Sequence, residues 1–323
     1  MFSLCQIFAG SALLLLLLLL AIGYVHEWMG GRRDARRDPA PGRLISVGDH
    51  RLHPLCKGSA APAVVIEQGA GELSKFWWPV QEEIAKFAQV YTYDRAGYGW
   101  SEQGRGGRTI EDRTREPHTL LSNAGVQGPM ILVAHSYGGF IVRAYAHEYP
   151  GQVAGLVLVD TAEESSVFQK EVLAFYSKVS AMNRVVGLFA RFGVLRLLRP
   201  WVPLDRFGVW LTRPSEFESA CDDLDSMMRV PAPMRASKSA GSLGSLPLMV
   251  MTHGQPFPGP FALLEKNWSE CQARLAALST ESVLMVAENS NHMIQQDEPE
   301  LVVDAIRRVH TAVREGRSLA LSQ

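Results

Sequence analysis

Apolar residues are unevenly distributed along this chain, and its N-terminal stretch differs from everything that follows. The run from Phe2 to Val25 contains no charged residue and includes uninterrupted leucine from Leu13 to Leu20. A helix rises about 1.5 Å per residue, so a run of this length can cross a hydrocarbon layer of about 30 Å. We therefore predict a hydrophobic N-terminal segment over residues 1–29, followed by a linker rich in Gly, Arg, Asp and Pro over residues 30–42.

This segment has two interpretations. Ala21-Ile22-Gly23 resembles the small-x-small site at which a signal peptide is cleaved, which would give an exported or periplasmic protein. No Lys or Arg precedes the apolar run, however, so the basic start of a signal peptide is missing. We favour an uncleaved, single-pass membrane anchor. Four arginines follow the run closely, and the positive-inside rule then places the body on the cytoplasmic side: Arg32, Arg33, Arg36 and Arg37.

From residue 43 onward, short apolar runs alternate with helical patterns, which is typical of an α/β fold with a mainly parallel sheet. The predicted strands are Arg43–Val47, Arg51–Leu55, Ala63–Glu67, Val90–Tyr93, Met130–Ala134, Leu156–Val159, Leu248–Thr252 and Val283–Val286. The predicted helices are Trp78–Phe87, Ile110–Asn123, Gly138–Tyr149, Phe261–Leu278 and Glu300–Val313.

The alternation breaks in one place, and this divides the body. Residues 161–246 give helical patterns without strands and are predicted to form a helical cap. The core is then predicted to comprise residues 43–160 and 247–315, with a C-terminal tail at 316–323. Composition fits this picture, because 47% hydrophobic and 20% charged residues are typical of a globular protein. A net charge of −1 gives no reason to expect a nucleic-acid partner.

The candidate nucleophile is Ser136, which lies between an apolar strand and a helical pattern that begins with Gly138-Gly139. A tight strand-to-helix turn projects a serine hydroxyl towards substrate, and small neighbours prevent collisions. The same turn aims the backbone N–H of Tyr137 at a developing oxyanion. The usual pattern is G-x-S-x-G, whereas this chain has Ala134 at the first small position.

A serine nucleophile needs a general base, and the base should follow the last strand. His292 lies there, between the last predicted strand and the closing helix. A second oxyanion donor should follow the third strand, where Gln68–Gly71 is rich in glycine, and we nominate the N–H of Ala70. The alternatives are a structural role for this histidine and an ordinary glycine-rich turn.

The acid that orients His292 is the least determined member of the predicted triad. Its commonest place is after the seventh strand, where the chain has no Asp or Glu before Glu265. We choose Asp160, which ends the sixth strand, and keep Glu163, Glu164 and Glu265 as alternatives. The cysteines form neither a CxxC pair nor a zinc-spaced cluster with histidine, so we expect no metal site.

Together these features resemble the α/β-hydrolase superfamily, over about residues 42–313. The resemblance rests on Val133–Gly139 (VAHSYGG), Asp94–Ser101 (DRAGYGWS), Gly155–Asp160 (GLVLVD) and Ser290–His292 (SNH). It implies an eight-stranded, mainly parallel sheet and a hydrolase without a cofactor. Members that act on epoxides or haloalkanes have Asp at the elbow, so Ser136 points to acyl transfer.

The sequence thus predicts a serine hydrolase, esterase-like, that acts through an acyl-enzyme on an ester of an apolar small molecule, with a thioester or amide as variants. One alternative is a cofactor-free haloperoxidase-like or C–C bond hydrolase reaction on the same triad. Another is a catalytically silent, membrane-anchored binding protein. The oligomeric state and the identity of the substrate do not follow from the sequence.

Overall fold

The computed structural model describes residues 4–104, 109–126, 128–201, 212–230 and 241–319. The start of the N-terminal segment, residues 202–211 and 231–240 of the predicted cap, and residues 320–323 of the predicted tail lie outside the described residues.

The described residues form an eight-stranded sheet in the order β1-β2-β4-β3-β5-β6-β7-β8. β2 pairs antiparallel with β1 and β4, and all the other pairs are parallel. The strands are β1 Ile45–Ser46, β2 Arg51–Lys57, β3 Val64–Glu67, β4 Val90–Asp94, β5 Met130–His135, β6 Val153–Val159, β7 Leu248–His253 and β8 Ser282–Ala287. Each predicted strand has a counterpart, so the predicted fold class is confirmed.

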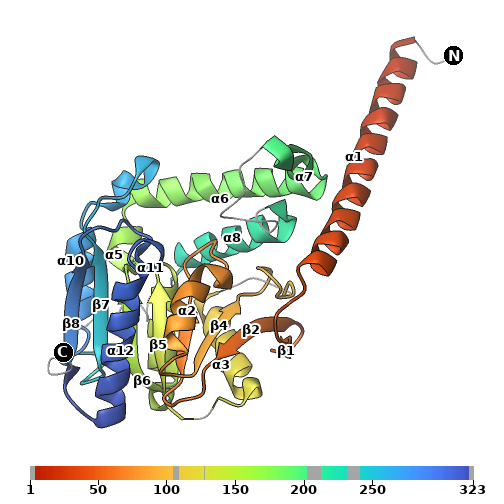
Figure 1. The fold of residues 1–323 in the computed structure, drawn as a ribbon. Helices are drawn as coiled ribbons and strands as arrows, with labels where there is room; N and C mark the ends of the chain where they lie inside the picture. Colours follow the sequence, from red (N-terminus) through yellow and green to blue (C-terminus); the bar gives the residue numbers. More distant parts are fainter. Residues whose placement is uncertain (1–3, 105–108, 127, 202–211, 231–240, 320–323) are drawn as a thin grey trace.

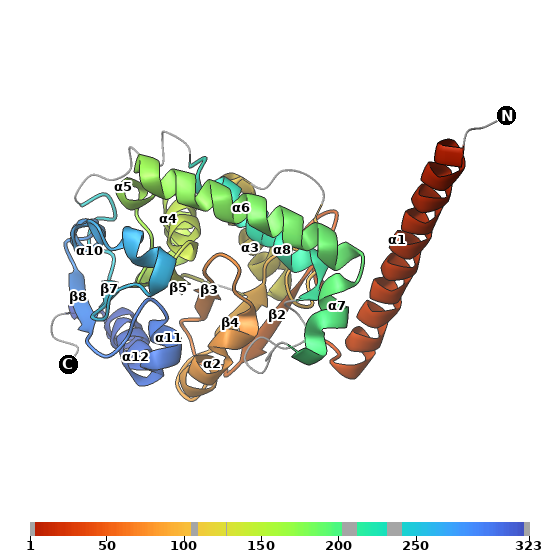
Figure 2. The ribbon, with the colours of Figure 1, turned by 90° about the horizontal axis from the view of Figure 1, so that it is seen from above.

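Helices cover both faces of this sheet (Figures 1 and 2). One face packs against α3 Ile110–Ala124, α4 Gly138–Glu148 and α10 Trp268–Ala276, and the other against α2 Trp78–Ile84 and α12 Pro299–Glu315. Successive side chains of a strand point to opposite faces. In β3, Val65 accordingly joins one apolar cluster, while Val64 and Ile66 join the other. Burial on both faces explains why these strands are apolar throughout.

The segment between β6 and β7 contributes helices above the sheet (Figure 1). They are α5 Glu164–Val167, α6 Lys170–Arg191, α7 Val194–Leu198, the 3₁₀ turn Arg199–Trp201 and α8 Pro214–Met227. α6 and α8 pack on each other, and Figure 2 shows α6 lying across the top of the molecule. The division into core and cap stays a prediction, and this placement supports it.

A buried group of charges joins α8 to the core. Asp223 of α8 accepts hydrogen bonds at 2.8 Å from both the Arg95 guanidinium and the Tyr98 hydroxyl, and it also pairs with Arg113. Arg95 in turn pairs with Glu67 at 2.8 Å. All five side chains are buried. A buried charge is stable only when it is paired and hydrogen-bonded, so this group fixes α8 over the sheet.

Two segments differ from the sequence-based predictions. The helix predicted over Phe261–Leu278 is a 3₁₀ turn at Gly259–Leu264 followed by α10, because Asn267 takes a left-handed conformation (φ 68°) that interrupts a helix. The linker predicted from residue 30 begins later, because α1 runs continuously from Leu4 to Arg37. Ion pairs of Arg196 with Glu27 (2.8 Å) and Asp34 (2.7 Å) stabilise this extension.

The short helical and 3₁₀ segments complete the described elements. They are the 3₁₀ turns Ser74–Trp77 and Pro150–Gln152 and the helix α11 Ile294–Asp297. Among the described residues, α1 is the one helix that is long and apolar enough to cross a membrane, and its most apolar stretch is exposed.

Candidate active site

Ser136 sits at a strained turn between β5 and α4. Its φ is 50°, in the left-handed region that residues with a side chain seldom occupy. The turn is possible because its neighbours are small. A Cβ on Gly138 would lie 2.7 Å from the carbonyl oxygen of Glu67, and a Cβ on Gly139 would lie 2.5 Å from Thr161. Ala134 occupies the remaining small position and is fully buried in the core. This local geometry presents the Ser136 side chain at the carboxyl edge of the sheet.

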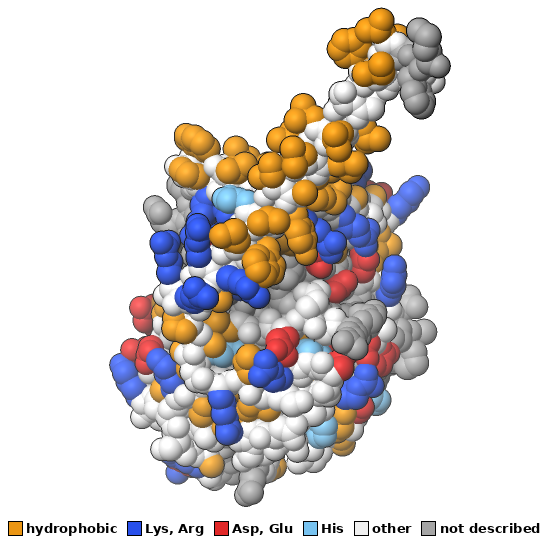
Figure 3. Space-filling model, turned by 90° about the vertical axis from the view of Figure 1, so that its right-hand side faces the viewer, with side chains coloured by type: hydrophobic (Ala, Val, Ile, Leu, Met, Phe, Trp, Pro, Cys, Tyr) orange, Lys and Arg blue, Asp and Glu red, His pale blue; other side chains and the backbone are white. Residues whose placement is uncertain are grey.

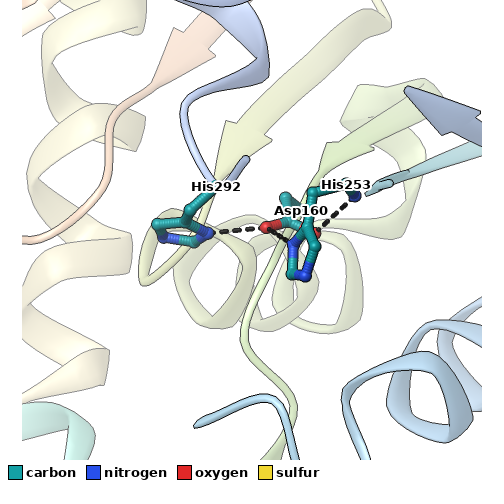
Figure 4. Close-up of side chains that lie close together, drawn as sticks. All are labelled: Asp160, His253 and His292. Carbon is teal, nitrogen blue, oxygen red and sulfur yellow. Dashed lines mark hydrogen bonds and ion pairs between the residues drawn. The ribbon is translucent and has the colours of Figure 1, made fainter. Parts of the chain in front are cut away.

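Asp160 and His292 meet at the same edge from distant parts of the chain. Asp160 follows β6 and is fully buried, while His292 follows β8 and is partly exposed. The Nδ1 atom of His292 lies 2.6 Å from Oδ2 of Asp160 (Figure 4). An imidazole held through Nδ1 by a carboxylate keeps Nε2 available to accept a proton. The structure therefore brings together the base and the first-choice acid of the sequence analysis.

A second histidine, which the sequence analysis did not identify, shares this carboxylate. Nδ1 of His253, at the end of β7, lies 2.7 Å from the same Oδ2 of Asp160 (Figure 4). The other oxygen, Oδ1, accepts hydrogen bonds from Nε1 of Trp268 at 2.7 Å and from the backbone N–H of His253 at 3.2 Å. The signal in the sequence that could have identified His253 was its position at the end of β7, where the acid of a triad is commonest. In this structure β7 supplies a hydrogen-bond donor, His253, and the neighbouring strand β6 is followed by the carboxylate, Asp160.

These contacts set the charge states of the pair. Burial would raise the pKa of Asp160, but hydrogen bonds from His253 and His292 outweigh burial and hold the pKa well below its ordinary value. Burial lowers the pKa of His292 below its ordinary value of 6.5, since desolvation of the cation outweighs the attraction of Asp160. At neutral pH the site thus holds a carboxylate beside a neutral imidazole, as a general base requires.

Two of the three alternative acids have partners away from the site, and the third lies at its edge. Glu163 caps α5 by accepting the Ser165 N–H at 2.8 Å, and Glu164 pairs with Arg143 at 3.0 Å. Glu265 contacts the far nitrogen, Nε2, of His253 at 3.4 Å. Among these acids, Glu265 alone thus contacts a residue that is hydrogen-bonded to Asp160. It contacts the nitrogen of His253 that does not face Asp160.

Ser136 and His292 line one cavity of about 380 Å³ beneath α6. The two proposed oxyanion residues, Tyr137 and Ala70, line it as well. The remaining wall is mainly apolar and comes from α6, α8 and the segment after β7: Tyr176, Val179, Leu224, Met227, Phe257 and Leu264. The cavity therefore combines a serine and an imidazole with a mostly apolar wall.

A buried polar network supports this edge from below. Glu72 accepts the backbone N–H of Gly69 at 2.7 Å and contacts Nδ1 of His135 at 3.1 Å. Nε2 of His135 lies 2.8 Å from the carbonyl oxygen of His292. Burial would raise the pKa of Glu72, but the neighbouring His135 lowers it to about 2. The network connects the Gly69 loop, the elbow and the loop of His292, so it holds three parts of the site in register.

A metal ion bound by Asp160, His253 and His292 would compete with the hydrogen bonds between these three side chains. Asp160, His253 and His292 offer ligand atoms that lie within 4.8 Å of one another, and these residue types can hold zinc. However, both Nδ1 atoms already lie at hydrogen-bond distance from Oδ2 of Asp160.

Comparison with known proteins gives consistent results. The profile of the alpha/beta hydrolase fold matches residues 62–198. An uncharacterized protein, YqjL, from Bacillus subtilis is 29% identical over 256 residues, covering 79% of this chain and 86% of that protein. An AB hydrolase superfamily protein of Gibberella zeae is 26% identical and covers 78% of this chain and 87% of its own length.

Solved structures show the same fold at low identity. A thermophilic esterase from Thermogutta terrifontis superposes with a TM-score of 0.60 and 22% identity, covering 84% of this chain and 100% of that chain. An enol-lactonase from Burkholderia xenovorans gives a TM-score of 0.60 and 19% identity over 83% and 100% of the two chains. With the sheet order and the elbow described above, these matches show that the chain has the α/β-hydrolase fold, with residues 62–198 matching the family profile.

Proposed function

We propose that the chain is a serine hydrolase that cleaves an ester of an apolar substrate through an acyl-enzyme. The supporting observation is that Ser136, on a turn with positive φ, lines the same cavity as His292, whose Nδ1 is bound to Asp160. A strained serine beside a neutral imidazole that a carboxylate orients is the arrangement for nucleophilic catalysis.

The reaction proceeds in two halves. Nε2 of His292 takes the proton of the Ser136 hydroxyl while Oγ attacks the carbonyl carbon of the ester. The imidazolium, stabilised by Asp160, then gives this proton to the leaving alcohol oxygen, and the acyl group remains on Ser136. In the second half His292 takes a proton from water, the hydroxide attacks the acyl carbon, and Ser136 regains its proton as the acid leaves. The backbone N–H groups of Tyr137 and Ala70 stabilise the oxyanion in both halves.

The composition of the cavity wall favours a substrate whose acyl or alcohol portion is apolar. Its side chains are mostly aliphatic and aromatic, while the charged group Asp160 is buried behind His292. Apolar walls favour a substrate by removing its surface from water. We extend the proposal to the N-terminal helix, which we take to be an uncleaved anchor with the body on the side of Arg32 and Arg33.

Active-site labelling tests the enzymatic part of the proposal. A fluorophosphonate probe should label the wild-type chain, and labelling should disappear in Ser136→Ala. Ester turnover should fall by about 10³-fold or more in that variant, because the acyl-enzyme cannot form. A matched control is Ser177→Ala, which changes an exposed serine of α6.

The labelling result also separates the alternatives. A wild-type chain that folds but neither labels nor turns over esters would refute the proposal and favour a silent binding protein. Labelling without ester turnover would favour another reaction on the same triad.

A further inference from the structure

Exposed apolar side chains gather on the outer side of the cap. Six of them, in α6, α7 and the 3₁₀ turn after α7, have between 47% and 77% of their surface exposed. We call them the cap apolar face, and they are Val185, Leu188, Phe189, Leu197, Leu198 and Trp201. Figure 3 shows apolar side chains gathered on the body beside α1, with basic side chains below them. Such a patch marks a surface that is covered by a partner or a membrane.

The N-terminal helix contacts this region at the end of its apolar run. A Cβ on Gly23 would lie 2.3 Å from the carbonyl oxygen of Phe192, and a Cβ on Gly193 would lie 3.0 Å from that of Gly23. The backbones therefore approach each other as closely as glycine allows. One turn further along α1, Arg196 pairs with the buried Glu27 at 2.8 Å. The α6–α7 turn is thus fixed to α1 at Gly23 and Glu27.

This contact sets the level of the cap relative to a bilayer. A helix needs about 20 residues to cross the hydrocarbon layer, so most of the charge-free run from Phe2 to Val25 must lie within that layer. Its end, and with it the α6–α7 turn, must then lie at the boundary of the hydrocarbon. Aromatic side chains mark the same level, as they do at membrane interfaces: Tyr24 and Trp28 on α1 and Trp201 on the cap are all more than half exposed. Arg32, stacked 3.8 Å from the Trp28 ring, follows directly.

We propose that the cap apolar face is seated in the interfacial layer of the bilayer that α1 crosses. The inference rests on the anchor part of the proposed function, and it commits to lipid as the occupant. A consequence concerns substrate, since the inner side of α6 lines the catalytic cavity through Tyr176, Val179 and Asn183. One helix thus separates the site from the membrane, and the substrate class is an ester dissolved in lipid.

Site-specific photo-cross-linking of the full chain in vesicles tests this placement. Separate variants carry p-benzoylphenylalanine as Phe189→p-benzoylphenylalanine on the cap apolar face, Leu284→p-benzoylphenylalanine on β8, and Leu16→p-benzoylphenylalanine in α1. Leu284 is a matched control, because it is 43% exposed and apolar but lies on the edge strand far from α1 (Figure 1). The vesicles contain phosphatidylcholine and phosphatidylglycerol, and mass spectrometry measures lipid adducts after irradiation.

We expect position 189 to give several times more lipid adduct than position 284, and position 16 to give at least as much as position 189. Adduct at 16 with only the background of 284 at 189 would overturn the inference and leave the anchor intact. Cross-links from 189 to a second copy of the chain would overturn it in favour of a protein interface. Absence of lipid adduct at 16 would overturn both the anchor and the inference, while fluorophosphonate labelling reports on catalysis separately. Thermal unfolding checks that each variant folds.

Discussion

Two buried carboxylates, Asp160 at the candidate active site and Asp223 on α8, have similar surroundings but different partners. Both are fully buried and each accepts several hydrogen bonds. The partners of Asp160 are two imidazoles and an indole, which are neutral or can lose a proton. Those of Asp223 include two guanidinium groups, which stay charged.

This difference separates a group that can do chemistry from one that holds the fold. His292 can take and release a proton beside Asp160, because it also reaches the cavity. For Asp223, burial would raise the pKa, but Arg113 and Arg95 lower it below its ordinary value, so the carboxylate is charged at neutral pH. Burial and charge alone therefore do not distinguish a candidate catalytic acid from a structural one, whereas a titratable partner at a cavity does.

The largest expected effect on catalysis is that of Asp160→Asn. An amide cannot stabilise the imidazolium or fix the tautomer of His292, so kcat should fall by about 10⁴-fold, as in other triads. Stability should change less than in Asp223→Asn, because both histidines can shift their protons to suit the amide. Steady-state kinetics and thermal unfolding measure the two effects. Full activity in this variant would show that Asp160 is not the acid of the triad and would favour Glu265, which contacts His253.

Asp223→Asn should act mainly on stability. It leaves Arg95 and Arg113 buried without their shared counter-charge, which should lower the free energy of unfolding by about 3–5 kcal/mol. Denaturant unfolding measures this loss, with Asp304→Asn on the exposed side of α12 as the control. If Asp223→Asn were as stable as the control, the comparison between the two carboxylates would fail.

The smallest expected effect is a shift of the pH profile in His253→Phe. With its pKa below 6.5, His292 becomes protonated as the pH falls, so kcat/KM should decrease on the acidic side. Without the hydrogen bond from His253, the negative charge of Asp160 is stabilised by His292 and no longer by a second imidazole. Asp160 then stabilises the imidazolium of His292 more strongly, which raises the pKa of His292. The acidic limb should then move to higher pH by up to about one unit.

His253→Asn provides the matched comparison, because its amide N–H can replace Nδ1 as a donor to Asp160. The acidic limb should stay near its wild-type position in this variant. Equal shifts in both variants, or none in either, would show that the second histidine does not tune the first.

The sequence by itself determined the sheet, the turn at Ser136 and the position of His292 after the last strand, because each follows from a local pattern. Apolar runs specify strands that are buried on both faces, and a serine or histidine directly after a strand must lie at the carboxyl edge of a parallel sheet. This is why Ser136 and His292 could be named from their positions. The α/β-hydrolase resemblance depended on the same strand ends.

Only the tertiary structure decided which side chains meet. The pairing of Asp160 with both histidines, of Asp223 with two arginines, and of Gly23 with the α6–α7 turn joins residues far apart in the chain. Hydrogen bonds and glycine contacts act over a few ångströms and leave no periodic signal in the sequence. An acid beside a strand end therefore looks the same whether it faces Nδ1 of a histidine or an arginine, and only the packing of the helices between them distinguishes the two.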